Sequence, residues 1–353
     1  MGRSRAGLVQ RYDAPVTTRL RNCDPALRRA WHSLCRDTEI GLQPRAFRLL
    51  GEDWVVWRDL DGTARVFRDL CPHRQAPLSL GSCTEGTLRC PYHGWSFNAE
   101  GACVDIPALG SDATYPPRAK LTGPAGVHES HGIIFIAPDE PLTPKPVVAA
   151  ASDPTMMRGD VPVETTRGGA GLLADNFLDM AHFPFVHAGT FGADEVREVP
   201  PYTVTRDGYR FEAVYEHDFA NREDPKVATG EHPLIQRRRL TYRYTAPFHL
   251  ELDIHFLETG GTNVIGFFLT PVDDDHVRVY SSLWRNDMNG DETLMQAAVD
   301  FEVAVIAEDL ALQSRFGQLS LPLDPTIEVH TRADKTTIEL RRILSEFCTA
   351  ASA

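Results

Sequence analysis

Long apolar runs are missing from this sequence, and their absence excludes one class of protein. No segment approaches the roughly 20 consecutive apolar residues that a membrane-spanning helix needs. The N-terminal stretch MGRSRAGLVQRYDAP carries basic residues without the apolar region that follows them in a secretory signal. We therefore expect a protein that neither crosses a membrane nor enters the secretory route.

Cysteine and positive charge are also scarce. The 353 residues include 7 cysteines, an odd number that is too small for a disulfide scaffold. We expect a reducing cytoplasm, where thiols are more often ligands than bridges. Lys and Arg total 36 against 49 Asp and Glu, and the net charge of −13 argues against a nucleic-acid partner.

The N-terminal part of the chain has the pattern of a small all-β unit. Residues 53–58 and 64–68 read as strands joined through the turn dipeptide Asp61-Gly62. Residues 139–146 are polar and Pro-rich, which is typical of a linker. The predicted division is an N-terminal segment packing on the large domain (1–45), a small β domain (46–138) and the large domain itself (139–353).

The C-terminal part mixes helical and strand patterns. Apolar residues recur at roughly helical spacing in the segment from Glu292 to Phe316. Together with the β unit, this predicts an α+β protein whose larger sheet has helices on one face. The expected elements are helices at 171–181, 292–316 and 335–347, and strands at 239–256 and 264–284, the last divided by a turn at 273–275.

Two Cys-His pairs provide the first metal signal. Cys71-Pro72-His73 and Cys90-Pro91-Tyr92-His93 each offer one thiolate and one imidazole. A zinc site of two Cys and two His usually places a Cys pair before a His pair. Mixed pairs are what a Rieske [2Fe–2S] cluster needs, because two thiolates hold one iron and two imidazoles hold the other. We predict that Cys71, His73, Cys90 and His93 bind such a cluster, with zinc as the alternative.

The second signal is the segment from Asn176 to His187. Asn176, Asp179 and His182 advance by three residues, which predicts one helical face. Pro184 should interrupt that helix and let His187 return beside His182. Two imidazoles and one carboxylate form the facial triad that binds Fe(II) with open positions for oxygen. Taken alone, paired histidines in a helix are more often packing or zinc features.

The motifs CPHRQAPLSLG, CPYHGWSF and N-x2-D-x2-H-x4-H together resemble one family. They are similar to those of Rieske non-haem iron aromatic ring-hydroxylating oxygenases, in the alpha subunits of the vanillate demethylase and phthalate oxygenase kind. Gln75 stands where many members have Gly. Respiratory Rieske proteins add a disulfide whose cysteines would fall at Ala76 and Tyr92, so that type is excluded.

The resemblance implies the roles of further residues. It makes Asp309 the carboxylate ligand rather than Glu308, which points about 100° away on a helix. It implies that Asp179 links His182 to a cluster histidine of a neighbouring subunit, and that Asn176 lies near the iron without binding it. The implied fold is a Rieske domain followed by a helix-grip-like catalytic domain with a curved antiparallel sheet.

The resemblance also implies the activity and the partners. The chain would be a terminal oxygenase that uses O2 to hydroxylate a hydrophobic, aromatic small molecule, or alternatively an O- or N-demethylase. Because the sequence has no flavin or nicotinamide fingerprint, electrons from NAD(P)H must arrive through a separate reductase, with or without a ferredoxin. Transfer between subunits implies a head-to-tail ring, a homotrimer. The rivals from other classes are an electron carrier without catalysis and a zinc-binding structural protein.

The sequence leaves the substrate open. Aromatic side chains able to line an apolar pocket are Phe177, Phe183, Phe185, Phe267 and Phe268. Aromatic residues at such spacings are usually core residues.

Overall fold

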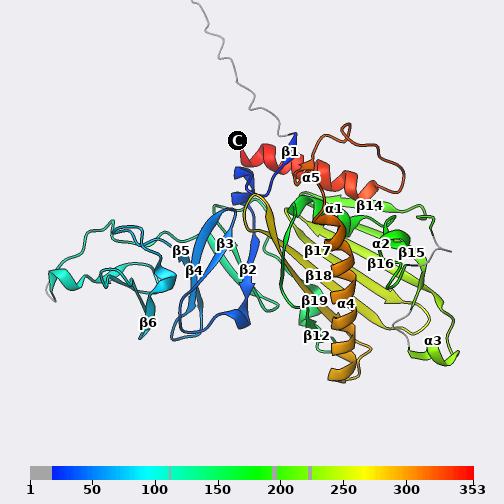
Figure 1. The fold of residues 1–353 in the computed structure, drawn as a ribbon, viewed down its shortest axis with the longest axis horizontal. Coiled ribbons are helices and arrows are strands. Elements are labelled where there is room, and N and C mark those ends of the chain that lie inside the picture. Colours follow the sequence, from blue (N-terminus) through cyan, green and yellow to red (C-terminus); the bar gives the residue numbers. More distant parts are fainter. Residues whose placement is uncertain (1–17, 111–112, 193–196, 222–224) are drawn as a thin grey trace, which may run out of the picture.

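The computed structural model describes residues 18–353 except 111–112, 193–196 and 222–224. The first 17 residues of the predicted N-terminal packing segment (1–45) therefore lie outside the described residues. Figure 1 shows an elongated molecule with a small β part at one end and a large sheet with helices at the other. The predicted α+β class is confirmed. Among the described residues, no helix is long and apolar enough to cross a membrane.

The small β part consists of two sheets. One has the order β3-β4-β5 and the other β6-β7-β8-β9. Asp59 stabilises the turn between β4 and β5, since its Oδ1 accepts hydrogen bonds from the backbone N–H groups of Asp61 and Thr63. The strands are β3 (Arg45–Leu49), β4 (Glu52–Arg58), β5 (Ala64–Arg68), β6 (Ser82–Thr84), β7 (Thr87–Arg89), β8 (Ser96–Phe97) and β9 (Cys103–Asp105).

A third sheet connects the small part to the large one. Its order is β10 (Gly126–Ser130), β11 (Ile133–Ala137) and β2 (His32–Arg36). Phe135 of β11 belongs to one buried cluster with Phe268 of the large sheet. The Ser33 hydroxyl lies 2.6 Å from the Thr270 hydroxyl, which ties β2 to the same sheet.

The large sheet is antiparallel and has eight strands. Its path is β12-β19-β18-β17-β16-β15-β14, and β13 also pairs with β19. Along β16, Leu240 and Tyr242 are buried while Arg239 is exposed, the alternation of a sheet with one covered face. The strands are β12 (Met157–Asp160), β13 (Glu164–Arg167), β14 (Thr203–Asp207), β15 (Arg210–Ala220), β16 (Ile235–Thr245), β17 (His249–Phe256), β18 (Thr262–Pro271) and β19 (His276–Arg285). The segment predicted as strand from 239 to 256 is thus a hairpin.

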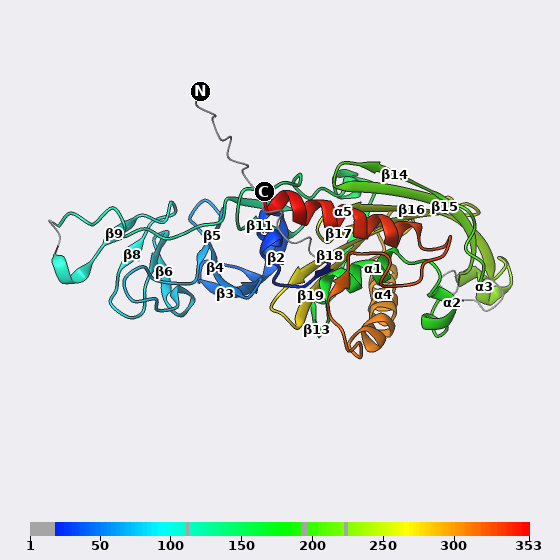
Figure 2. The same cartoon turned by 90° about the horizontal axis from the view of Figure 1, so that it is seen from above.

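Three longer helices cover one face of the sheet (Figures 1 and 2). They are α1 (Ala170–Leu178), α4 (Glu292–Gln313) and α5 (Lys335–Ala351). The α4 helix begins after Asp291, whose carboxylate accepts hydrogen bonds from the N–H groups of Thr293 and Leu294. It ends three residues before the predicted boundary, whereas α5 runs four residues beyond its own.

Two buried contacts fix α1. The Asn22 side chain accepts a hydrogen bond from the Ala170 N–H and donates one to the Gly168 carbonyl. At the other side, buried Arg341 of α5 pairs with Asp175 of α1 at 2.5 Å. The position of α1 is therefore set by segments about 150 residues away in each direction.

The remaining elements are short. They are α2 (Phe183–Val186), α3 (Pro225–Thr229), the strand pair β1 (Arg19–Leu20) and β20 (Leu321–Pro322), and the 3₁₀ turns Pro25–Arg29, Asp37–Glu39, Leu78–Leu80, Pro107–Leu109 and Ala149–Ser152.

Candidate metal centres

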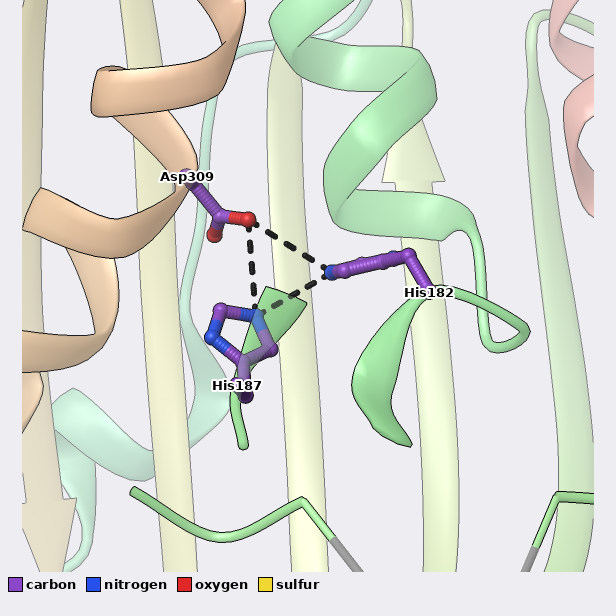
Figure 3. Close-up of side chains that lie close together, drawn as sticks. All are labelled: His182, His187 and Asp309. Carbon is purple, nitrogen blue, oxygen red and sulfur yellow. Dashed lines mark hydrogen bonds and ion pairs between the residues drawn. The ribbon is translucent and has the colours of Figure 1, made fainter. Parts of the chain in front are cut away.

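Two histidines and one aspartate converge between α4 and the large sheet (Figure 3). The Nε2 atoms of His182 and His187 are 3.1 Å apart. Asp309 Oδ1 lies 3.5 Å from His182 Nε2 and 3.4 Å from His187 Nε2. In the described part of the chain, this is the one group of three or more His, Cys, Asp or Glu residues whose ligand atoms all lie within 4.8 Å.

The two histidines come together because helix α1 ends earlier in the chain than the sequence pattern predicted. The α1 helix ends at Leu178, where the Thr336 hydroxyl donates to the Leu178 carbonyl. Asp179 is extended, and Pro184 lies in the first turn of α2 rather than interrupting α1. The prediction of one helix carrying residues 176, 179 and 182 was therefore wrong, although the paired histidines it was meant to explain are present.

The hydrogen-bond partners of the two imidazoles favour a bound cation. The His182 Nδ1 lies 3.2 Å from Asp179 Oδ2, and the His187 Nδ1 lies 2.9 Å from Glu308 Oε2. Each Nδ1 can therefore carry the proton that its carboxylate accepts, which leaves a lone pair on each Nε2. Two lone pairs and a carboxylate oxygen facing one another repel unless a cation lies among them.

The spacing of these atoms fits a transition metal. Asp309 Oδ1 is buried without a hydrogen-bond partner, which is costly for a carboxylate unless a metal compensates it. Adjacent ligands bonded to one metal at about 2.1 Å are about 3 Å apart, close to the three observed distances. Two imidazoles and one carboxylate are the ligand set of non-haem Fe(II) sites with open positions.

Glu308, which the sequence analysis considered only as the less favoured carboxylate ligand, has a different role at this site. It points away from the ligand atoms, as its helical phase predicts, but its Oε2 also accepts a hydrogen bond from the Thr190 hydroxyl at 2.9 Å. It is thereby held against His187 Nδ1. Carboxylates in this position fix the orientation and basicity of a ligating imidazole. The only available signal was adjacency to Asp309, because the contact joins segments 121 residues apart.

We expect Glu308→Ala to weaken metal binding by ~10 to 100-fold, the usual effect of removing such a carboxylate. The measurement is iron retained during titration with a chelator. Glu308→Gln serves as the matched control, because the amide oxygen can still accept the imidazole proton, and its loss should be smaller. Equal retention of iron by wild type and Glu308→Ala would contradict the role.

Asp179 and Asn176 lie beside this centre. Burial acts to raise the pKa of Asp179, but the hydrogen bond and charge of His182, with the backbone N–H of Ala181, hold it below its usual value. Asp179 therefore remains a carboxylate at neutral pH. Asn176 lines the cavity beside the histidines, and its side-chain oxygen accepts a hydrogen bond from Gln313 at 2.9 Å.

A mostly apolar cavity opens beside the three ligand atoms. It encloses about 970 Å³ of empty space, counting its open mouth. Of the five phenylalanines considered from the sequence, Phe177, Phe183 and Phe267 line it. Phe185 is 66% exposed and Phe268 lies in the core on the opposite face of the sheet, so these two are not lining residues. Phe191, Phe219 and Phe301 also line the cavity and were missed.

The two Cys-His loops meet in the small β part. Cys71 and Cys90 are buried, each 2% exposed, whereas His73 and His93 are exposed. The two imidazole centroids are 4.5 Å apart, and Trp95 stacks on His73. Inner thiols and outer imidazoles match the asymmetry of a Rieske cluster.

Gln75 occupies a strained position in the first loop. Its φ of 58° lies in the left-handed region, where glycine is favoured and other residues are strained. Glycine would adopt this backbone conformation without strain. Gln75 nevertheless forms the turn, in which its N–H donates to the Cys71 carbonyl at 2.8 Å.

Comparisons with protein families match both parts. Residues 30–116 match the Rieske [2Fe-2S] domain, and residues 167–350 match the vanillate O-demethylase oxygenase C-terminal domain. The methylxanthine N1-demethylase NdmA of Pseudomonas putida is 30% identical over 328 residues, covering 91% of this chain and 89% of that protein. The vanillate O-demethylase oxygenase subunit of a Pseudomonas species is 26% identical, covering 86% and 96%.

Solved structures show the same architecture. The structure of Pseudomonas putida NdmA with caffeine has a TM-score of 0.79 and 28% identity, covering 94% of this chain and 96% of that one. Dicamba monooxygenase bound to dicamba has a TM-score of 0.77 at 20% identity, covering 92% and 98%, and shares the fold.

Proposed function

Because the chain belongs to the Rieske non-haem iron oxygenases with the vanillate O-demethylase oxygenase C-terminal domain, we propose how its residues perform the chemistry of that family. The protein is a terminal oxygenase, an oxidoreductase with a Rieske [2Fe–2S] cluster and a mononuclear iron. Cys71, Cys90 and the two loop histidines hold the cluster. The main support for this function is that His182 Nε2, His187 Nε2 and Asp309 Oδ1 converge beside an apolar cavity.

The two rival classes explain less of the chain. An electron carrier needs no second ligand group and leaves residues 167–350 without a role. A structural zinc site would use four closed ligands, whereas the group here offers three and faces a cavity.

When bound, the mononuclear iron supplies the site at which O2 is activated with electrons that the cluster delivers one at a time. The chain's own residues prepare that site. Asp179 and Glu308 hold the two imidazoles with their Nε2 atoms facing inward. Phe177, stacked on Phe267 at 4.9 Å, belongs to the apolar wall that keeps water from a bound substrate.

The substrate we propose is a hydrophobic aromatic small molecule. Aromatic walls bind planar rings by stacking and by burial of apolar area. Hydroxylation and O- or N-demethylation both fit, because hydroxylating a methyl group on oxygen or nitrogen leads to its loss. The relatives named as N- and O-demethylases favour demethylation.

We further propose a head-to-tail homotrimer that takes electrons from a separate reductase, with or without a ferredoxin. The small β part, which carries the Cys-His loops, and helix α4 lie in separate parts of the molecule (Figure 1). A cluster in one subunit that lies against the iron site of the next shortens the electron path, and such heterologous contacts close into rings. The functional units would be an N-terminal segment (1–45), a Rieske domain (46–138) and a catalytic domain (139–353).

The purified protein should be brown and contain about three iron atoms per chain, two in the cluster and one mononuclear. Its reduced form should give the low-average-g electron paramagnetic resonance signal of a histidine-ligated [2Fe–2S] cluster. Metal analysis and spectroscopy on one sample test both centres. Cys71→Ser is the control, because it should lose the visible absorbance and keep the mononuclear iron. A colourless protein with stoichiometric zinc would refute the assignment.

A further inference from the structure

One end of the cavity is polar, and the proposed iron chemistry does not use it. The cavity-facing residues of β18 are Asn263, Ile265 and Phe267, whereas Val264 and Phe268 face the opposite core. Phe267 stacks on Phe177 in the last turn of α1, just before the segment with the metal ligands. Asn263 lies four residues from Phe267, or about 13 Å along the strand, at the far end of the cavity wall.

Helix α4 carries a second polar group away from the metal site. Glu302 is buried and lines the same cavity. It precedes Asp309 by two turns of α4, about 10 Å. A ligand whose reacting carbon lies beside the metal site therefore reaches this end with the opposite side of its ring system.

Asn263 presents an unsatisfied acceptor at that end. The residue is 6% exposed, and its Oδ1 is buried without a hydrogen-bond partner. Buried polar groups are nearly always paired, and an exception in a cavity calls for a missing partner. The partner must be an N–H or O–H group, because an oxygen lone pair accepts and does not donate.

The charges around the cavity end favour a neutral ligand. Arg238 and Glu302 are both buried there, one basic and one acidic. The Arg238 guanidinium lies over the rings of Phe219 at 5.6 Å and Phe256 at 4.9 Å. An additional buried charge on the ligand would upset this balance and lose its hydration.

We propose that Asn263 selects the substrate by accepting a hydrogen bond from a neutral aromatic molecule. The donor is an N–H or phenolic O–H on the side of the molecule opposite to the carbon that is oxidised. This inference rests on the proposed function, since it takes the cavity as the substrate site. It adds to the proposed function the chemical class of the substrate and the residue that recognises it.

Matched pairs of probes test this inference on the holoenzyme without turnover. Theobromine and caffeine differ by one N–H capped with methyl, and vanillin and veratraldehyde differ by one O–H capped in the same way. Ligand-observed nuclear magnetic resonance should show about tenfold tighter binding of the uncapped member in at least one pair, since the capped member leaves a buried acceptor unpaired. Asn263→Leu should remove that preference without lowering Tm, because it removes an unpaired group.

Ile265→Leu, on the same strand and face, is the matched control and should keep the preference. Equal binding within every pair, no binding of any uncapped probe, or a preference that survives Asn263→Leu overturns the inference. A lower Tm in Asn263→Leu with the preference intact would show that Asn263 stabilises the fold and does not select the substrate. Iron content, measured on the same samples, separates a failure of the proposed function from a failure of this inference. A sample with three irons per chain and no preference between capped and uncapped probes refutes only the role of Asn263.

Discussion

Asp309→Ala is expected to lose the mononuclear iron and with it all oxygenation, while the Rieske spectrum stays unchanged. The variant removes the one carboxylate of the ligand group and leaves two imidazoles facing each other at 3.1 Å. Two neutral nitrogens bind Fe(II) far more weakly than a set that includes a carboxylate. Iron analysis should fall from about three to about two atoms per chain, and product formation should be undetectable.

Two other acidic residues of α4 serve as comparisons. Asp300 lies on the same helix, is exposed and accepts a hydrogen bond from Gln296, so Asp300→Ala should retain three irons and full activity. Glu308→Ala should bind iron weakly but measurably, because its carboxylate holds His187 without pointing at the metal site. If Glu308→Ala lost the iron and Asp309→Ala kept it, the assignment of the carboxylate ligand would be wrong.

The sequence was sufficient to predict what depends on local spacing. The β4–β5 hairpin follows from alternation and a turn dipeptide, and β5 matches the predicted 64–68. The Cys-His loops carry their own spacing, and the structure brings Cys71 and Cys90 into one buried cluster. These features depend on residues close together in the sequence, so they can be predicted without knowing which distant segments are in contact.

The boundaries and the supporting residues of the metal site were not predictable in that way. The end of α1 depends on Thr336, 158 residues beyond the carbonyl it binds. The role of Glu308 depends on a contact 121 residues away in sequence. Phe267 and Phe268 were both considered for the cavity, but successive side chains of a strand point to opposite faces of the sheet, so only Phe267 lines it and Phe268 is a core residue.

Asp179→Asn is expected to stop electron transfer between the proposed centres while both keep their metals. The asparagine preserves size, and its oxygen can still accept from His182 Nδ1, so the imidazole should keep its orientation. What disappears is the charge, which the lowered pKa of Asp179 shows to be present at neutral pH. The rate should fall by well over the ~10 to 100-fold seen for carboxylates that support one ligand, because this one would support a histidine at each centre.

The measurement is a single turnover. A chemically reduced cluster is mixed with O2 and a compound that accelerates its reoxidation in wild type, and cluster absorbance is followed. Asp179→Asn should remain reduced, with normal iron content and normal binding of the compound. A normal reoxidation rate in the variant would end the bridging role of Asp179.

Mixed assemblies then decide whether the electron crosses a subunit boundary. Chains carrying Asp179→Asn keep an intact cluster, and chains carrying Cys71→Ser keep an intact iron site. In a head-to-tail ring, the cluster of the first kind can face the iron site of the second, so a mixture should regain part of the activity that each variant alone lacks. Transfer within one chain predicts no recovery, because neither chain then holds both a working cluster and a working connection. Recovered activity in mixed rings would therefore support both the ring and the role of Asp179.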